Sequence, residues 1–318
     1  MSQVNQIFVQ DQTESIDTLV DSNISCGESY LVNAKGKLIY CMRWQPKTEL
    51  KAIIFLCHGF AEHIGYYKKL AQQLSKDSYF VIAHDHIGHG RSEGIRAHVT
   101  EVEEYVLDVF QHIDYIRNKH LQLPLFIVGH SMGGTISIKA AMQRPYYFQG
   151  VVLVAPAITL NRDEATPIKI LLAKLLAKIV PTCPVSPLSL KDISRDLDEI
   201  EFMKNDNLRY HGGVRAKWGL AFMTALQEIN NNLSSIEWPF LVLHGSSDRI
   251  IDVSGSKALY NTANSKDKTI KIFRDAYHNL LHDTQDVQKQ TADDICTWIG
   301  ERIAKFKNAD NDEKLVNV

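Results

Sequence analysis

The sequence contains little that would build a covalent, metal-bound or membrane-spanning framework. Its five cysteines are scattered over 318 residues and none forms a C-x-x-C pair, which argues against a disulfide framework or zinc knuckle and fits a reducing compartment. No uncharged run approaches the roughly 18 residues of a membrane-spanning helix. The net charge of −2, without a long basic run, gives no reason to expect nucleic acid binding. The N-terminus lacks the regions of a signal peptide, so the expected location is cytoplasmic.

What the sequence does contain is an alternation of apolar runs with helical patterns. A hairpin is expected around Asn33–Gly36, and six apolar runs of the kind found in strands buried on both faces follow it. These runs cover residues 52–59, 79–86, 125–131, 151–157, 239–248 and 269–278. Helical patterns at 66–76 and 101–120 follow the first two. The alternation predicts an α/β fold, with a mostly parallel sheet of about eight strands and helices on both faces.

The alternation stops between Ala157 and Glu237, where helix-like segments occur without a convincing strand. An insertion of this kind between two strands of a parallel sheet is expected to form a helical cap. We therefore divide the chain into five segments: an N-terminal extension (1–26), two parts of one core (27–156 and 238–306), the cap (157–237) and a polar C-terminal tail (307–318).

The stretch GHSMGG follows one of the buried strands and precedes a helix of small residues. A G-x-S-x-G motif in this position predicts a nucleophile elbow, a turn so tight that the serine projects from the end of the sheet. Gly129 and Gly133 allow the neighbouring backbone to pass without a Cβ clash. Ser131 is therefore the candidate nucleophile, and the Met132 N–H at the start of the helix can donate to a developing oxyanion.

A serine hydroxyl requires a base and a group that orients the base. His278 follows the last predicted strand, where a loop can bring it to Ser131, whereas His282 is expected to be a surface or capping residue. Asp248 ends the preceding strand and is the expected acid. Asp252 is the alternative acid, although its place before VSGSKALY suits a helix N-cap.

The motifs HGFAEH, HDHIGHGRSEG, GHSMGG, GSSDRIID and DAYHNLLHD, in this order, resemble those of the monoacylglycerol lipases within the α/β-hydrolase superfamily. The resemblance covers roughly residues 31–303 and is weaker in the insertion. It implies an α/β-hydrolase fold and hydrolysis of a monoacylglycerol to glycerol and fatty acid, without metal or other cofactor. Ser131, Asp248 and His278 match the family's triad, and Phe60 and Met132 match its backbone oxyanion donors. Phe60 departs from the small residue that the family often has at its position.

Two further groups are candidates for substrate binding. Glu62 and His63 flank the proposed oxyanion loop, where they either hold the polar part of a substrate or anchor the loop through hydrogen bonds. The segment between Pro167 and Pro181 is expected to be an amphipathic helix with Lys174 and Lys178 on its polar side. Its apolar face consists of Ile168, Leu172, Leu175, Leu176 and Ile179. Such a helix either lies in a membrane interface, which makes a peripheral membrane contact one expectation, or packs on the core as an ordinary cap helix.

Other functions remain open at the level of the sequence. Within the fold, a lysophospholipase, a general carboxylesterase and a serine aminopeptidase are alternatives, and oligomeric state is not indicated. His84, His86 and His89 form H-x-H-x-x-H, close to the ligand run of metallo-β-lactamase-like hydrolases, but Gly88 occupies the position of the expected aspartate. A non-catalytic binding module is a further alternative, although such modules usually lack a member of the triad.

Overall fold

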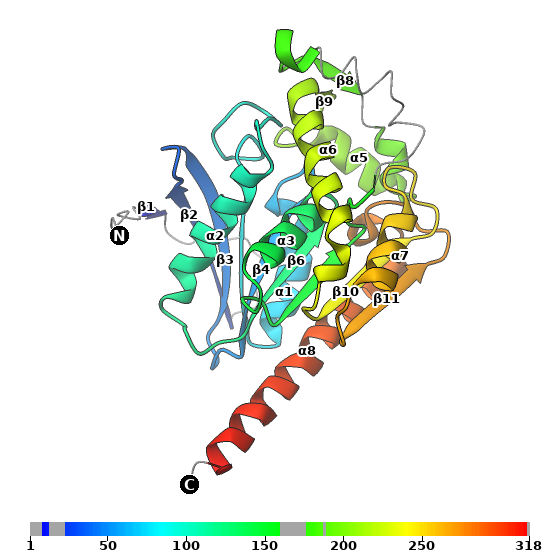
Figure 1. Cartoon of the computed structure of the whole chain (residues 1–318). Coiled ribbons are helices and arrows are strands. Elements are labelled where there is room, and N and C mark those ends of the chain that lie inside the picture. Colours follow the sequence, from blue (N-terminus) through cyan, green and yellow to red (C-terminus); the bar gives the residue numbers. More distant parts are fainter. Residues whose placement is uncertain (1–7, 13–22, 160–175, 187–188, 317–318) are drawn as a thin grey trace.

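The computed structural model describes residues 8–12, 23–159, 176–186 and 189–316. Nine strands within these residues form one twisted sheet in the order β1-β2-β3-β5-β4-β6-β7-β10-β11 (Figure 1). Their bounds are β1 Phe8–Gln12, β2 Ile24–Val32, β3 Leu38–Pro46, β4 Ala52–Cys57, β5 Tyr79–His84, β6 Leu125–His130, β7 Gly150–Val154, β10 Phe240–Gly245 and β11 Lys268–Phe273. The pairs from β5 to β11 are parallel, whereas β1, β2 and β3 join the sheet antiparallel.

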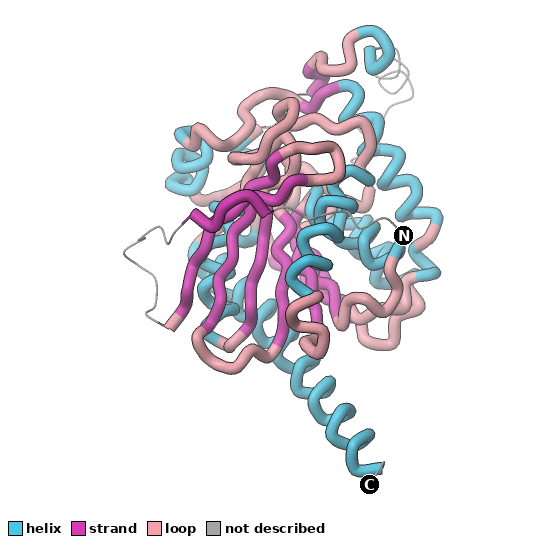
Figure 2. The backbone as a smooth tube through the Cα atoms, turned by 90° about the vertical axis from the view of Figure 1, so that its left-hand side faces the viewer, coloured by secondary structure: helices cyan, strands magenta, loops and turns pink. Residues whose placement is uncertain are grey.

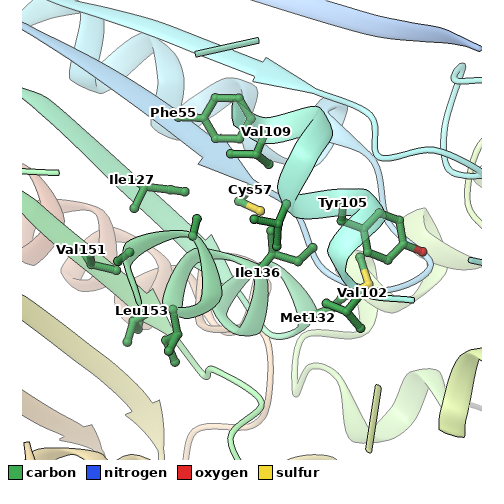
Figure 3. Packing of buried hydrophobic residues seen from close by; sticks show 14 of the residues in the cluster. Phe55, Cys57, Val102, Tyr105, Val109, Ile127, Met132, Ile136, Val151 and Leu153 are labelled. Atoms are coloured by element: carbon green, nitrogen blue, oxygen red, sulfur yellow. The ribbon is translucent and has the colours of Figure 1, made fainter. Parts of the chain in front are cut away.

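The parallel strands are apolar because helices cover both faces of the sheet. Strands β4, β5, β6, β7 and β10 are buried at every position. One face packs against α2 (Glu103–Arg117), α3 (Met132–Gln143) and α6 (Ala216–Asn231). Figure 3 shows part of this core, in which Tyr105 and Val109 of α2 lie near Ile136 of α3. The other face packs against α1 (Lys68–Lys76) and α8 (Gln285–Val316).

The cap region crosses the end of the sheet at which the parallel strands finish. In Figure 1 it is the upper part, with α5 (Leu197–Asn205), the start of α6 and the small sheet of β8 (Pro184–Ser186) and β9 (Val214–Arg215). Helix α7 (Val253–Thr262) follows β10. None of the helices in the described ranges is both long enough and apolar enough to cross a membrane.

Comparison with the sequence expectations confirms the fold and corrects it at three places. All eight predicted strands are present, and β1 is an additional ninth within the predicted N-terminal extension. The insertion, which was expected to lack strands, contains β8 and β9. The predicted polar tail is helical to Val316 and forms the end of α8, which projects from the body in Figures 1 and 2. Most of the predicted amphipathic helix, including Ile168, Leu172 and Leu175, lies outside the described residues.

Five histidines pack together inside the core, beneath the carboxyl ends of β4 and β5. The ring centroids of His58 and His86 are 4.2 Å apart, those of His58 and His89 are 5.4 Å apart, and His84 stacks on His112 at 5.5 Å. All five are buried. Burial lowers the pKa of His58 to about 4 and that of His112 to about 3, and holds the pKa values of the other three well below the ordinary range.

This cluster predicts that the protein loses stability steeply in mild acid. Above pH about 6.5 the histidines are neutral in the folded and unfolded states, so stability is complete. Below it, the unfolded chain binds protons that the folded protein does not. Each histidine then lowers the free energy of unfolding by up to about 1.4 kcal/mol per pH unit until its folded pKa is reached. Urea denaturation between about pH 7.5 and 5 measures the slope.

Two single substitutions make the measurement specific. His112→Gln should reduce the slope by the contribution of one proton, because it removes one member of the cluster. His211→Gln is the control, since His211 is exposed in the cap region, and it should leave the slope unchanged. A free energy of unfolding that stays constant over this pH range would contradict the prediction.

Candidate active site

The turn between β6 and α3 has the geometry of a nucleophile elbow. Ser131 joins the two elements with φ 52° and ψ −116°, a left-handed conformation that is unusual for a residue with a Cβ. A Cβ on Gly133 would clash with the carbonyl oxygen of Cys57, and one on Gly129 would clash with the carbonyl oxygen of Gly133. The two glycines are therefore required by close backbone contacts, as the motif predicted, and the strain at Ser131 is held in place by the packed strand and helix.

Three side chains from the ends of different strands form one hydrogen-bonded chain. His278 Nε2 lies 2.9 Å from Ser131 Oγ, and His278 Nδ1 lies 2.7 Å from Asp248 Oδ2. His278 follows β11 and Asp248 follows β10, so the parallel order of the sheet brings the three together. With the Nδ1 proton donated to the carboxylate, Nε2 is free to accept the proton of the serine hydroxyl.

The Asp248 carboxylate is fixed on both oxygens. Its side chain is 0% exposed. Oδ1 accepts the backbone N–H groups of Ile250 at 2.8 Å and Ile251 at 2.9 Å, whereas Oδ2 faces His278 and also His244 Nε2 at 3.1 Å. Burial alone would raise the pKa of Asp248, but His278 and His244, through charge and hydrogen bonds, hold it well below the ordinary range. The group is therefore an ionised acceptor under ordinary conditions.

His244 is a member of this arrangement that the sequence did not identify. It is buried at the end of β10, with Nδ1 2.7 Å from Ser256 Oγ and Nε2 directed at Asp248 and at the carbonyl oxygen of Ile251. A Ser256 hydroxyl that donates to Nδ1 leaves the ring proton on Nε2, where it supports the carboxylate. In the sequence, its role is indicated only by its position at the end of a predicted strand, four residues before the predicted acid.

The two alternatives for the triad lie elsewhere. Asp252 caps α7 by accepting the N–H of Ser254 at 2.8 Å, as its sequence position suggested. His282 is buried, contrary to the expectation of a surface or capping residue. Its Nδ1 lies 2.7 Å from Glu199 Oε2 and its Nε2 lies 3.0 Å from the carbonyl oxygen of Tyr66. It therefore ties the cap region to the core.

Of the two expected oxyanion donors, Met132 directly follows the serine and Phe60 comes from the loop after β4. Met132 is the first residue of α3, and an N–H in the first turn of a helix has no acceptor within the helix. Phe60 lies in the loop after β4, and its ring packs on Trp218 of α6 with centroids 4.2 Å apart. The large side chain that departs from the family pattern thus packs against the cap helix α6. Both residues line the same cavity as Ser131 and His278.

That cavity has a volume of about 600 Å³ and lies between the sheet edge and the cap region. Trp218, Leu220, Phe222 and Met223 of α6 give it an apolar wall. Leu176, one of the residues predicted to bind substrate, also lines it. Ile179, predicted alongside Leu176, does not line it and is 68% exposed.

Glu62 and His63, the two candidates of the oxyanion loop, differ in position. Glu62 lines the cavity, with Oε1 2.7 Å from His130 Nδ1 and Oε2 accepting the Tyr67 hydroxyl at 3.2 Å. His63 does not line it. Its Nδ1 accepts the Gly65 N–H at 3.1 Å and its Nε2 lies 2.8 Å from Asp206 Oδ2. These bonds favour loop anchoring for His63, whereas Glu62 combines anchoring with access to the cavity.

The histidine run that suggested a metal site is arranged differently from a ligand set. His84 Nε2 contacts His86 Nδ1 at 3.3 Å, and His86 Nε2 contacts Cys57 Sγ at 3.3 Å, so the ring nitrogens face one another and the thiol. His89 Nδ1 lies 3.2 Å from the carbonyl oxygen of Ile87. Across the described ranges, no three His, Cys, Asp or Glu side chains are placed to hold one metal ion.

The comparisons with known proteins point to one family of hydrolases. The family model for "Serine aminopeptidase, S33" matches residues 48–285. Monoglyceride lipase of Rattus norvegicus is 38% identical over 86% of this chain and 91% of its own length. Monoacylglycerol lipase of Mycolicibacterium smegmatis is 34% identical over 80% of this chain and 90% of its own length. The crystal structure of Paleococcus ferrophilus monoacylglycerol lipase superimposes with a TM-score of 0.73 at 31% identity, covering 83% of this chain and 99% of that one.

The mostly parallel sheet with a serine elbow is that of the α/β-hydrolases, and the protein is a serine hydrolase of this fold. Within that class, the chain belongs to the serine aminopeptidase S33 family and, inside it, to the monoglyceride lipases.

Proposed function

We propose that the protein hydrolyses the ester of a monoacylglycerol to glycerol and a free fatty acid, with Ser131, His278 and Asp248 as its catalytic triad. The observation that carries the proposal is the hydrogen-bonded chain from Asp248 through His278 to Ser131 in a cavity with an apolar wall. The names of the monoglyceride lipase relatives support the substrate class.

The proposed reaction has two halves that use the same groups. His278 Nε2 accepts the proton of Ser131 Oγ while the serine oxygen attacks the ester carbonyl, and the oxyanion of the tetrahedral intermediate accepts the N–H groups of Phe60 and Met132. The imidazolium, stabilised by the Asp248 carboxylate, then gives its proton to the leaving glycerol oxygen. Water, deprotonated by His278, attacks the acyl-enzyme, and the imidazolium returns the proton to Ser131 Oγ as the fatty acid leaves. Apart from the substrate and one water molecule, every step uses groups of the chain.

The cap region completes the proposed site. The apolar wall from α6 suits an acyl chain, because transfer of each methylene out of water contributes about 0.8 kcal/mol. We further propose that the segment 157–237 acts as the cap and that the amphipathic segment 167–181 contacts membranes transiently. Support for the membrane contact comes from the sequence pattern and from Ile179, the exposed apolar residue at the end of that segment.

Two measurements test these proposals: a hydrolysis panel tests the substrate, and sedimentation with lipid vesicles tests the membrane contact. Monoacylglycerols, lysophospholipids, peptide amides and short-chain nitrophenyl esters are compared by kcat/KM. Monoacylglycerols should be the best substrates among the lipids, and the enzyme should sediment with lipid vesicles. A preference for lysophospholipid or for peptide would replace the proposed substrate, and an enzyme that never sediments with vesicles would remove the membrane contact.

A further inference from the structure

The Phe60 side chain connects the loop after β4 with the wall of the active-site cavity. Phe60 is only partly buried, and it lines this cavity together with Trp218 and Phe222 of α6. The ring centroids of Phe60 and Trp218 are 4.2 Å apart. Those of Trp218 and Phe222 are 4.7 Å apart, with an angle of 17° between the rings. The three side chains therefore form one aromatic stack that begins at the loop and continues along α6.

The protein holds this stack in place from two sides. The indole Nε1 of Trp218 donates to the hydroxyl oxygen of Tyr105 at 3.1 Å, and Tyr105 on α2 is 0% exposed. The loop itself is tied to the cap region, because the Tyr210 N–H donates to the carbonyl oxygen of Ala61 at 2.9 Å. Since close-packed groups yield little, the Phe60 ring has little room to move aside for a substrate.

The same ring lies close to the place where the ester carbonyl reacts. Only the Cβ and Cα atoms separate it from the backbone N–H of Phe60, which is the proposed oxyanion donor. A carbonyl oxygen held by this N–H and that of Met132 brings the first carbons of the acyl chain to the start of the aromatic stack. A substituent on carbon 2 of the acyl group adds volume at this point, and extra volume against a packed wall is unfavourable.

We propose that Phe60 makes the enzyme selective for unbranched acyl groups, because its ring fills the space that a substituent on carbon 2 requires. A straight chain passes along the stack of Phe60, Trp218 and Phe222, whereas a 2-alkyl group meets the Phe60 ring. The side chain that departs from the family pattern is then a specificity-determining residue, in addition to the role of its backbone N–H. The inference rests on the proposed function, because it assigns the acyl side of the same ester.

The test compares nitrophenyl octanoate with racemic nitrophenyl 2-methyloctanoate, which differ only by the methyl group on carbon 2. Phe60→Ala keeps the backbone N–H and removes the ring. The ratio of kcat/KM for the branched ester to that for the straight ester should therefore rise by about 10-fold or more over the wild-type ratio, the range found when a pocket must accept one extra carbon. Phe60→Leu, which retains part of the bulk, should give an intermediate ratio.

The matched control is Phe202→Ala on α5, where the side chain is 53% exposed, and it should leave the ratio unchanged. The ratio in one preparation is independent of the fraction of folded enzyme, so a partly unfolded variant still gives an answer.

An unchanged ratio in Phe60→Ala would overturn the inference. If that variant instead altered the preference between 1-octanoylglycerol and 2-octanoylglycerol, the ring would belong to the alcohol side, and the inference would be overturned as well. A wild-type enzyme that cleaves the nitrophenyl esters but neither octanoylglycerol would overturn the proposed function, while the ratio of the two nitrophenyl esters would still decide the role of Phe60.

Discussion

Ser131→Ala should abolish labelling by a fluorophosphonate probe and lower kcat by roughly 10³-fold or more, leaving the residual catalysis that the oxyanion donors and substrate binding provide. Alanine keeps the Cβ at φ 52° and removes only the hydroxyl that faces His278 Nε2 at 2.9 Å, so the elbow retains its shape. Loss of activity with an unchanged unfolding transition would therefore assign the chemistry to the hydroxyl group.

The matched control is Ser254→Ala on α7, where the serine is exposed. This variant should label and turn over as the wild type does. Continued labelling of folded Ser131→Ala would remove Ser131 as the nucleophile.

The sequence was sufficient to predict the elbow and the meeting of Ser131, Asp248 and His278, because each depends on the residues that follow a strand. Continuous apolar runs identify β4, β6 and β10 as strands buried on both faces, and in a parallel sheet the residues after such strands lie at one edge. The glycines Gly129 and Gly133 predict the strained turn at Ser131. These features need no knowledge of distant contacts.

Features that depend on distant contacts were missed. Strand β1 has the polar sequence FVQDQ and β8 has only three residues, so neither carries a periodic signal, and each becomes a strand by pairing with a neighbour. His282 is buried, and its partner Glu199 lies 83 residues away in the chain. Arg209 is buried in the cap region and lines the cavity, although a solvated surface is the ordinary place for an arginine.

His244 shows the same limit within the site itself. Its spacing from Asp248 is short, yet its role requires the turn after β10 to bring the carboxylate back over the strand end. From the sequence pattern alone, His244 is indistinguishable from an ordinary buried residue of the strand. The orientation of the acid thus depends on a second histidine that the family motifs do not mark.

The second large effect concerns this acid. Asp248→Asn should lower kcat by about 10³- to 10⁴-fold, while Asp252→Asn, the same change four residues on, should leave kcat within about 2-fold of the wild type. The reason is geometric. Oδ1 of Asp248 accepts two backbone N–H groups, so the amide oxygen of an asparagine must take that position and its NH₂ must face His278.

An NH₂ group facing Nδ1 of His278 turns that nitrogen into an acceptor and moves the ring proton to Nε2, where it opposes the serine hydroxyl. The base is then in the wrong tautomer, and the imidazolium loses the carboxylate that stabilises it. At residue 252 an asparagine still caps α7, because its side-chain oxygen accepts the Ser254 N–H as the aspartate does.

Steady-state kinetics on a soluble short-chain ester, with both variants at matched folded fractions, decides between the acids. A large loss in Asp252→Asn with a small one in Asp248→Asn would move the acid to Asp252 and leave the bond between Asp248 and His278 without a catalytic role.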